Sequence, residues 1–321
     1  MFLLQTIYGL KQAVFAFWVQ LLKALRDMKF DRSKADPCLY FKWTAIRLTL
    51  WISWVDDCVS VGKKELVLAA KKGMTDRFDC DKVGELTEFV GCKLDRTNDS
   101  LRIMQLVLMQ SFIDEFALPE GLAVATPAEP GLVLMKARAD ETVDTKTQTM
   151  FRSGVGKLIH MMKWSWPDVL NAVRDLTRQM SAATMCHVKA MKRVMTYLTA
   201  TPKQGLTLKP SKKWDGSKEF EFTISGFSNS DFAKELTERK SVSGWAVFLN
   251  GAPISVQSKM QDCTTLSVTE AELVAAMACA QDMLFSMQLM ESIGLTVKKP
   301  MVLTVDNKGA KDLANNWSVG G

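Results

Sequence analysis

The sequence predicts an α+β fold with more than one domain, on three observations. Two short apolar runs enclose a pair of adjacent aspartates, which is the pattern of a β-hairpin with an acidic turn. The middle of the chain holds three consecutive stretches with helical periodicity. The C-terminal third orders its strand-like and helix-like segments as a compact mixed α/β domain does. A length of 321 residues suits two domains or one bilobed domain.

Composition indicates a globular and mildly basic protein. The chain is 47% hydrophobic and 24% charged, which excludes an intrinsically disordered protein. Its net charge of +6 suits a polyanionic partner without demonstrating one. Seven cysteines scattered singly and two histidines favour a reducing compartment over a disulfide framework, and exclude a His-rich metal centre.

The N-terminal segment predicts a core helix over residues 5–28. Its apolar run at 13–19 is too short to span a membrane. Lys11, Gln20 and Lys23 also interrupt the pattern of a signal peptide. We therefore expect neither a secretory leader nor a transmembrane segment.

The most informative segment is the acidic hairpin predicted over residues 48–61, whose centre reads Trp54-Val55-Asp56-Asp57. Burying an unpaired carboxylate is costly, so two adjacent ones between apolar strands require a counter-ion. One interpretation is a divalent cation used in nucleotidyl transfer. The other is an ordinary hairpin in which both aspartates are turn residues.

Shorter elements and three helices follow. The expected order is a helix at 64–78, a strand at 84–94, a turn at 97–100, a helix at 107–117, a linker at 123–148, and helices at 149–163, 167–181 and 184–200. The last helix carries an apolar stripe formed by Val188, Met191, Val194, Met195 and Leu198. Its other face carries Lys189, Lys192 and Arg193, which either contact phosphates or form an ordinary solvated face.

A connector rich in Lys, Pro and Gly at 202–218 predicts the domain boundary. Beyond it we expect strands at 220–228, 244–249, 254–258 and 302–305, a long helix at 268–293, and a short helix at 308–315. The buried stripe of the long helix is predicted to comprise Leu273, Ala276, Met277, Ala280, Leu284 and Met287. Gly294 is placed to end this helix.

Three carboxylates stand at element ends in the C-terminal region: Asp231, Glu272 and Asp306. Ser267 and Glu270 fit a capping box, which leaves Glu272 free for another role. Acids gathered from several element ends can hold two metal ions. The alternative interpretation is that each of the three is simply an exposed acid at the edge of a loop.

Several motifs occur in a fixed order along nearly the whole chain. They include Tyr8-Gly9-Leu10-Lys11-Gln12-Ala13, Asp36-Pro37-Cys38, Trp54-Val55-Asp56-Asp57, Trp166-Pro167-Asp168, and Leu266-Ser267-x-Thr269-Glu270-Ala271-Glu272. In number and order they resemble the Pol polyprotein of copia-type LTR retrotransposons, which are transposable elements, in the region where reverse transcriptase is followed by RNase H.

The resemblance implies an incomplete reverse-transcriptase palm and thumb at 1–122, a linker with connection helices at 123–205, and a truncated RNase H-like mixed α/β domain at 218–321. It implies DNA synthesis from an RNA template by two-metal nucleotidyl transfer, with Mg²⁺ or Mn²⁺ as the cofactor. The implied partners are an RNA template, a DNA primer, an RNA–DNA hybrid and a deoxynucleotide, with no membrane. The implied location is intracellular, in a cytoplasmic particle or the nucleus, and the oligomeric state is left open.

The resemblance also assigns residues. Asp56 and Asp57 would be the polymerase acids and metal ligands, and Glu272 and Asp306 the matched RNase H acids and metal ligands. Nucleotide and nucleic-acid contacts fall on Gly9, Lys11, Gln12, Trp54, Lys189, Lys192 and Arg193.

The chain departs from the family pattern in four respects. The family's third polymerase aspartate lies on an upstream strand that this chain lacks, together with most of the fingers. Trp54 stands where the family has tyrosine. Asn229 stands where the family has its first RNase H carboxylate, and Asp231, on the same face of an extended strand, is the candidate substitute. The last RNase H acid falls beyond Gly321.

Two functions remain in view. The first is a fragment of an RNA-directed DNA polymerase with an RNase H-like domain, inactive as this chain alone because its catalytic sets are incomplete. The alternative is a non-catalytic nucleic-acid-binding remnant or a co-opted module. The sequence leaves enzymatic activity undecided between them.

Overall fold

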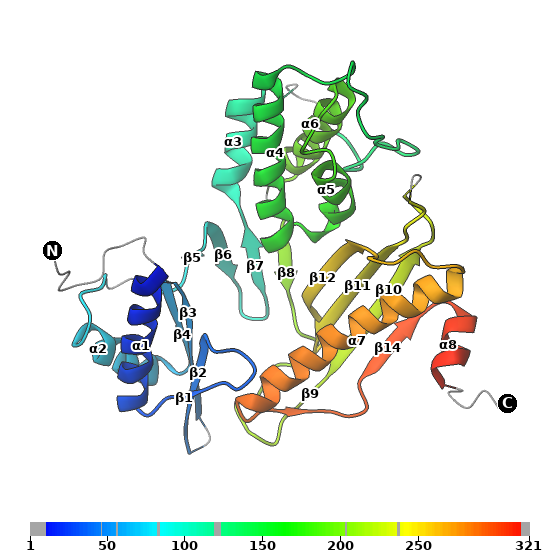
Figure 1. Cartoon of the computed structure of the whole chain (residues 1–321). Helices are drawn as coiled ribbons and strands as arrows, with labels where there is room; N and C mark the ends of the chain where they lie inside the picture. Colours follow the sequence, from blue (N-terminus) through cyan, green and yellow to red (C-terminus); the bar gives the residue numbers. More distant parts are fainter. Residues whose placement is uncertain are drawn as a thin grey trace. The chain divides into compact units, whose positions relative to one another are not determined.

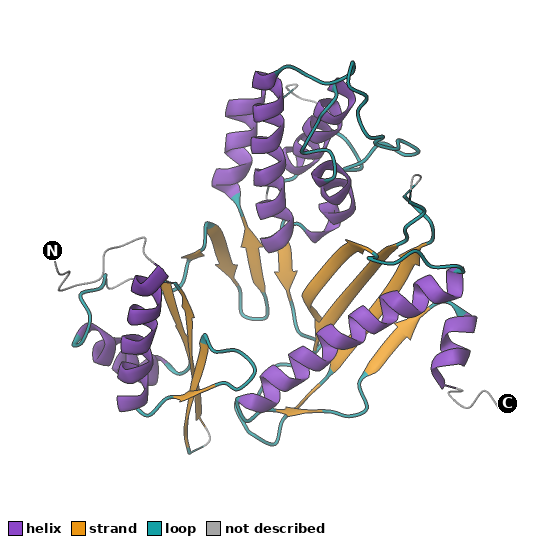
Figure 2. Ribbon diagram, in the orientation of Figure 1, coloured by secondary structure: helices purple, strands orange, loops and turns teal. Residues whose placement is uncertain are grey.

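The structure is a computed structural model that describes residues 11–45, 47–55, 57–81, 84–118, 123–202, 204–235 and 238–315. Runs of strands and runs of helices follow one another along this part of the chain, as Figure 1 labels them and Figure 2 distinguishes them by colour. Two compact units share these elements, and neither unit is one continuous stretch. The first comprises residues 1–86, 212–224 and 282–301, and the second comprises the remainder.

The N-terminal part of the first unit is an antiparallel sheet of four strands with two helices. In chain order these are α1 (Lys11–Asp27), β1 (Asp31–Arg32), β2 (Leu39–Thr44), β3 (Arg47–Trp54), β4 (Asp57–Val61) and α2 (Lys64–Thr75). The strands lie in the order β1-β2-β3-β4. Leu25, Tyr40 and Trp51 belong to the buried core between the helices and one face of the sheet. The predicted helices and the acidic hairpin are confirmed over the described residues.

The same unit also contains a short parallel pair, β9 (Glu221–Phe222) with β13 (Thr296–Val297), and the end of helix α7 (Val268–Ser292). Gly294 ends this helix as predicted, at φ 80°. The Gly294 N–H donates to the Glu291 carbonyl, and the Leu295 N–H donates to the Met290 carbonyl. This pair of hydrogen bonds is a Schellman motif. A Cβ atom at position 294 would lie 3.0 Å from Trp43 Nε1, so glycine is required there by both conformation and space.

The second unit begins with strands followed by a helical bundle. In chain order these are β5 (Glu88–Phe89), β6 (Cys92–Arg96), β7 (Leu101–Met104), α3 (Leu106–Phe116), α4 (Thr145–Trp164), a 3₁₀ turn (Pro167–Val169), α5 (Leu170–Thr177), α6 (Met185–Ala200) and β8 (Leu206–Leu208). The single strand predicted at 84–94 is wrong, because Val90 and Gly91 both have positive φ and turn the chain into a hairpin. The predicted connector at 202–218 likewise contains β8, which pairs with β7.

The helical bundle is the largest apolar core. All five residues of the predicted α6 stripe are buried in it, which confirms that stripe. Helix α4 begins at Thr145, four residues before its predicted start at 149. The reason is Asp144, whose carboxylate accepts from the N–H groups of Lys146 and Thr147 and so caps the helix early.

The C-terminal part of the second unit is built on a mixed sheet with strand order β12-β11-β10-β14. Its elements are β10 (Ile224–Asp231), β11 (Val242–Leu249), β12 (Ala252–Met260), β14 (Val302–Val305) and α8 (Lys308–Asn315), with α7 crossing one face in Figure 1. Strands β10 and β14 are parallel. Arg174 of α5 donates to Ser258 of β12 at 2.9 Å, which joins the bundle to this sheet.

The predicted buried stripe of α7 is wrong. Met277 and Leu284 are 57% and 46% exposed, whereas Ala271, Ala275 and Cys279 are completely buried. The helix is apolar nearly all round, so hydrophobicity does not determine which face is buried. Small side chains four residues apart do, because they let the helix approach the sheet, where the Cys279 thiol donates to the Phe227 carbonyl at 3.8 Å.

Among the described helices, α7 alone is long and apolar enough to cross a membrane. Core helices meet the same criterion. The completely buried residues Ala271, Ala275 and Cys279 and the thiol contact to β10 give α7 a packed face in this fold.

Candidate functional site

The tip of the acidic hairpin positions two of the residues predicted for the polymerase site. Trp54 and Asp57 are cross-strand partners at the ends of β3 and β4. Val55 between them has φ 56°, so the turn is tight. Asp57 is exposed, while Asp56 and Gly9 lie outside the described residues, as does the side chain of Lys11. Gln12 is exposed in the first turn of α1.

An apolar shelf borders Asp57, and sequence reasoning missed it. Ile52, Trp54 and Val61, which we call the palm shelf, are each more than a third exposed. They alternate along their strands with residues of the opposite, helix-covered face, such as Trp51. The shelf and Asp57 therefore share the open face of the sheet. The signal was present in the sequence, since period-2 alternation assigns residues 52, 54, 57, 59 and 61 to one face, of which Val59 is buried.

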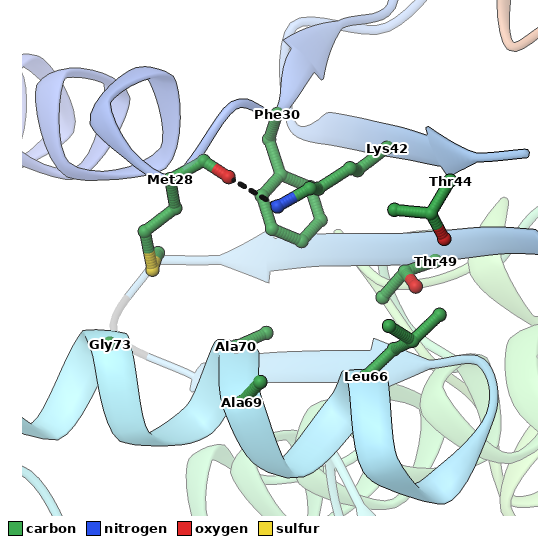
Figure 3. Close-up of a pocket in the computed structure, with 9 residues that line it drawn as sticks. All are labelled: Met28, Phe30, Lys42, Thr44, Thr49, Leu66, Ala69, Ala70 and Gly73. Carbon is green, nitrogen blue, oxygen red and sulfur yellow. Dashed lines mark hydrogen bonds between the residues drawn. The ribbon is translucent and has the colours of Figure 1, made fainter.

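The opposite face holds a small cavity of about 210 Å³ between α2 and the strands, shown in Figure 3. Among the described residues that line it, Lys42 alone is charged. Its ammonium donates to the Met28 carbonyl at 2.8 Å. The described residues that line it include no carboxylate, thiol or imidazole, the groups that acid–base and nucleophilic chemistry most often use.

A second candidate site lies at the end of β10, where Glu272 is buried. One of its carboxylate oxygens, Oε1, accepts from the Ser230 backbone N–H at 2.9 Å and from the Ser230 hydroxyl at 2.8 Å. Asn229 Oδ1 accepts from the same N–H at 2.8 Å. The structure therefore brings Asn229 and Glu272 together around one donor, the Ser230 N–H.

The other two acids are arranged less favourably. Asp231 is exposed and forms an ion pair with Lys234 at 3.0 Å. Asp306 is exposed directly after β14. Because Ser228 and Val305 are partners in the parallel pair, Asn229 and Asp306 follow at the same end of adjacent strands. The substitution of Asp231 for Asn229 remains a prediction, and the pairing with Lys234 counts against it.

This edge does not fit a pair of magnesium ions. Within the described ranges no group of three His, Cys, Asp or Glu side chains is placed to hold a metal. Asn229 is neutral, and Oε1 of Glu272 is already occupied by Ser230. Its other oxygen, Oε2, is buried without a partner among the described residues. Mg²⁺ requires several oxygen ligands in octahedral geometry, so we derive no metal-dependent step here.

The capping box at the start of α7 is confirmed with one difference. Ser267 Oγ accepts from the Glu270 N–H at 3.1 Å. Glu270 reaches back to the N–H of Leu266 at 2.7 Å, one residue before the cap. Glu270 is thus structural, which leaves Glu272 as the acid directed at the sheet.

The cations of α6 do not form one solvated face. Lys189 is exposed, whereas Lys192 and Arg193 are half-buried. Arg193 donates to the Thr126 hydroxyl at 3.2 Å, a contact between α6 and the linker that sequence reasoning did not foresee.

His187 fastens the linker to the start of α6. Its Nδ1 accepts from the Thr184 N–H at 3.0 Å, and its Nε2 lies 2.9 Å from the Met135 carbonyl. The ring is therefore neutral, with its proton on Nε2. Burial lowers its pKa from the usual 6.5, against the opposing effect of the bond to Met135.

The depressed pKa of His187 predicts that acid destabilises the bundle. The unfolded chain takes up this proton more readily than the folded one, so stability is complete above about pH 6.5 and falls below it, by at most about 1.4 kcal/mol per pH unit. Urea unfolding across this range measures the slope. His187→Gln, which retains a capping-box residue, should remove it.

Comparisons with known proteins agree with the order of motifs. Residues 2–130 match the family model described as reverse transcriptase (RNA-dependent DNA polymerase). The chain is 29% identical over 319 residues to the retrovirus-related Pol polyprotein from transposon TNT 1-94 of Nicotiana tabacum, covering 97% of this chain and 23% of the relative. It is 28% identical over 313 residues to that from transposon RE1 of Arabidopsis thaliana, covering 97% and 20%.

A shorter relative is the secreted RxLR effector protein 161 of Plasmopara viticola, 32% identical over 132 residues, which are 41% of this chain and 87% of the relative. No solved structure matches the chain. This chain thus spans about a quarter or less of the length of the two Pol relatives.

Proposed function

Because the chain belongs to the Pol polyproteins of copia-type LTR retrotransposons and carries their reverse transcriptase region, we propose that the acidic hairpin is the catalytic turn of an RNA-directed DNA polymerase. The observation that carries this proposal is the Trp54–Asp57 pair at the tip of β3 and β4, inside the segment that matches the reverse transcriptase model. Asp56 and Asp57 are the proposed metal ligands, and Mg²⁺ would supply charge stabilisation in phosphoryl transfer.

The palm shelf supports a nucleic-acid partner on this face. Its exposed aromatic and aliphatic surface adjoins Asp57 and offers a platform on which a base or sugar can lie. In this proposal the shelf supports the primer end, and the RNA template pairs with the primer above it. Trp54 keeps the aromatic bulk of the family's tyrosine and lacks its hydroxyl.

Replacing Trp54 by alanine should weaken binding of an RNA template annealed to a DNA primer by about tenfold, because an aromatic stacking contact contributes about 1–3 kcal/mol. Leu68→Ala, an equally exposed apolar residue on α2, is the matched control and should leave affinity unchanged. Fluorescence anisotropy at fixed salt makes the measurement. Equal affinity of Trp54→Ala and the unmodified chain would exclude the shelf as the binding face.

We further propose that residues 218–321 are an RNase H-like domain whose acid set is incomplete. The order of its strands and helices, and the meeting of Asn229 with Glu272 at Ser230, support this. The neutral side chain at 229 is the reason we expect no cleavage of the RNA strand of a hybrid. Two aspartates in the hairpin likewise hold two ions less well than three acids do.

The 321-residue chain tested alone is therefore expected to extend no primer on an RNA template, with either Mg²⁺ or Mn²⁺. The assay is gel analysis of a labelled primer, with an active reverse transcriptase as positive control. Template-dependent extension that disappears in Asp56→Asn would show that the two aspartates suffice and would overturn the proposal of inactivity.

A further inference from the structure

A cavity in the helical bundle has the walls of a ligand site, independently of the polymerase proposal. It encloses about 280 Å³ between α5, α6 and residues 127–134. Its accessible apolar lining comes from Leu132, Leu134, Ala172 and Ala190, whereas Leu176 and Val194, which also border it, are each 1% exposed. Ala172 and Ala190 line it from the two helices, and their small side chains leave the space open. We call this space the connection cavity.

One wall of the connection cavity is cationic and carries an unsatisfied donor. Lys189 and Arg193, one turn apart on α6, both line it. Arg193 donates one terminal N–H to the Thr126 hydroxyl. Its Nε–H is buried with no acceptor among the described residues. A buried donor without an acceptor costs about 1–3 kcal/mol. Because that Nε–H is buried, a ligand in the cavity would meet the terminal N–H groups of Arg193 instead.

The acids that line the cavity leave this cationic wall available. Asp175 is held by Arg174 in an ion pair of 2.8 Å. Glu129 lies on an exposed part of the linker. The cavity therefore combines an apolar lining with a guanidinium and an ammonium on one side, an arrangement that favours a ligand with one anionic and one apolar end.

We propose that the connection cavity binds a small organic carboxylate whose apolar body is about one aromatic ring in size. An apolar cavity of about 150 Å³ is enough for benzene, so 280 Å³ holds a ring and a short acidic arm. A carboxylate is the planar partner that a guanidinium binds through charge-assisted hydrogen bonds. The ring lies against Leu132, Ala172 and Ala190, and the carboxylate meets Arg193 and Lys189.

The test is calorimetric titration of the full chain with 3-phenylpropionate, and with 3-phenylpropanol as the neutral counterpart. Saturable binding of the acid is expected with a Kd on the order of 1 mM. Arg193→Met, which keeps the apolar stem, should weaken it about tenfold. Ala190→Leu should abolish it by filling the space. Lys192→Met, a neighbouring half-buried cation that does not line the cavity, is the matched control and should bind as the unmodified chain does.

Several outcomes would overturn the proposal. If the alcohol binds as tightly as the acid, the cationic wall does not recognise the carboxylate. If no saturable heat is seen up to the solubility limit, the cavity does not bind the ligand. Equal losses in Lys192→Met and Arg193→Met would show a general charge effect. Displacement of the acid by a short DNA strand would assign Arg193 to a nucleic-acid backbone. Circular dichroism verifies that each variant is folded. If Ala190→Leu unfolds, the comparison of Arg193→Met with Lys192→Met still tests the proposal.

Discussion

Replacing Gly154 with valine is expected to lower the free energy of unfolding of the helical bundle by about 3 kcal/mol. Gly154 is buried in α4 where that helix meets α3 and α6. A Cβ atom there would collide with Met191 Sδ and would lie 2.9 Å from both Met195 Cε and Phe116 Cε1. Interiors are close-packed, so three core side chains would have to leave their positions together.

The control for this prediction is the same substitution at Gly156. This residue lies two positions further along α4 and is exposed, and a Cβ atom there meets nothing within 4 Å. Both variants change helix propensity equally, so the difference between their unfolding free energies reports packing alone. Urea unfolding followed by far-UV circular dichroism measures it. Equal stabilities would show that the three helices do not approach as closely as described.

The second large effect is expected from Asn229→Asp, which should make the stability of the C-terminal sheet depend on Mg²⁺. The new carboxylate would share the Ser230 N–H with Glu272, placing two like charges close together. Without a metal ion the two carboxylates repel by about 3 kcal/mol, for a separation near 5 Å and an effective dielectric constant near 20. Solvent and salt screening at the exposed position 229 reduces this repulsion. Mg²⁺ between them would reverse this, contributing about 2.7 kcal/mol at a hundred times its Kd.

The measurement is thermal unfolding with and without Mg²⁺. The unmodified chain should show no response beyond that to ionic strength, which a matched concentration of monovalent salt controls. Asn229→Asp combined with Glu272→Gln should lose the metal effect, while Asp231→Asn should not alter it. The opposite result is stabilisation of the unmodified chain by Mg²⁺, removed by Glu272→Gln. It would mean that Asn229 already serves as a neutral oxygen ligand.

Local signals predicted most of the helices because their causes are local. Helix α8 occupies the predicted residues 308–315, and Gly294 ends α7 through its own conformation. The buried face of α7 was mispredicted because large apolar side chains lie all round it, and the contact with the sheet selects the small ones. Strand β8 escaped notice because a three-residue strand is defined by its partner, β7, about a hundred positions away.

In the candidate sites too, features with a local cause were predicted and features that depend on distant contacts were not. Glu272 was identified from sequence because its neighbour Glu270 is accounted for by the capping box. The sharing of the Ser230 N–H by Asn229 and Glu272 depends on how α7 lies against β10, which no local pattern encodes. For Arg193 the sequence left a phosphate contact and a solvated face open, and its bond to Thr126 was missed because the linker has no periodicity. The pairing of Asp56 with Asp57 stays a prediction, since Asp56 lies outside the described residues.

The pairing of β7 with β8 has a consequence for how this protein is assembled. Leu101 and Leu208 are partners, as are Ile103 and Leu206, so the chain enters and leaves the four helices at neighbouring points. The helical bundle is thus an insertion between the two strands of a single β-hairpin, and the pairing of these strands holds its two ends together. A short turn joining residue 104 to residue 206 would close the hairpin without the helices. A chain shortened in this way should keep the register of β7 with β8.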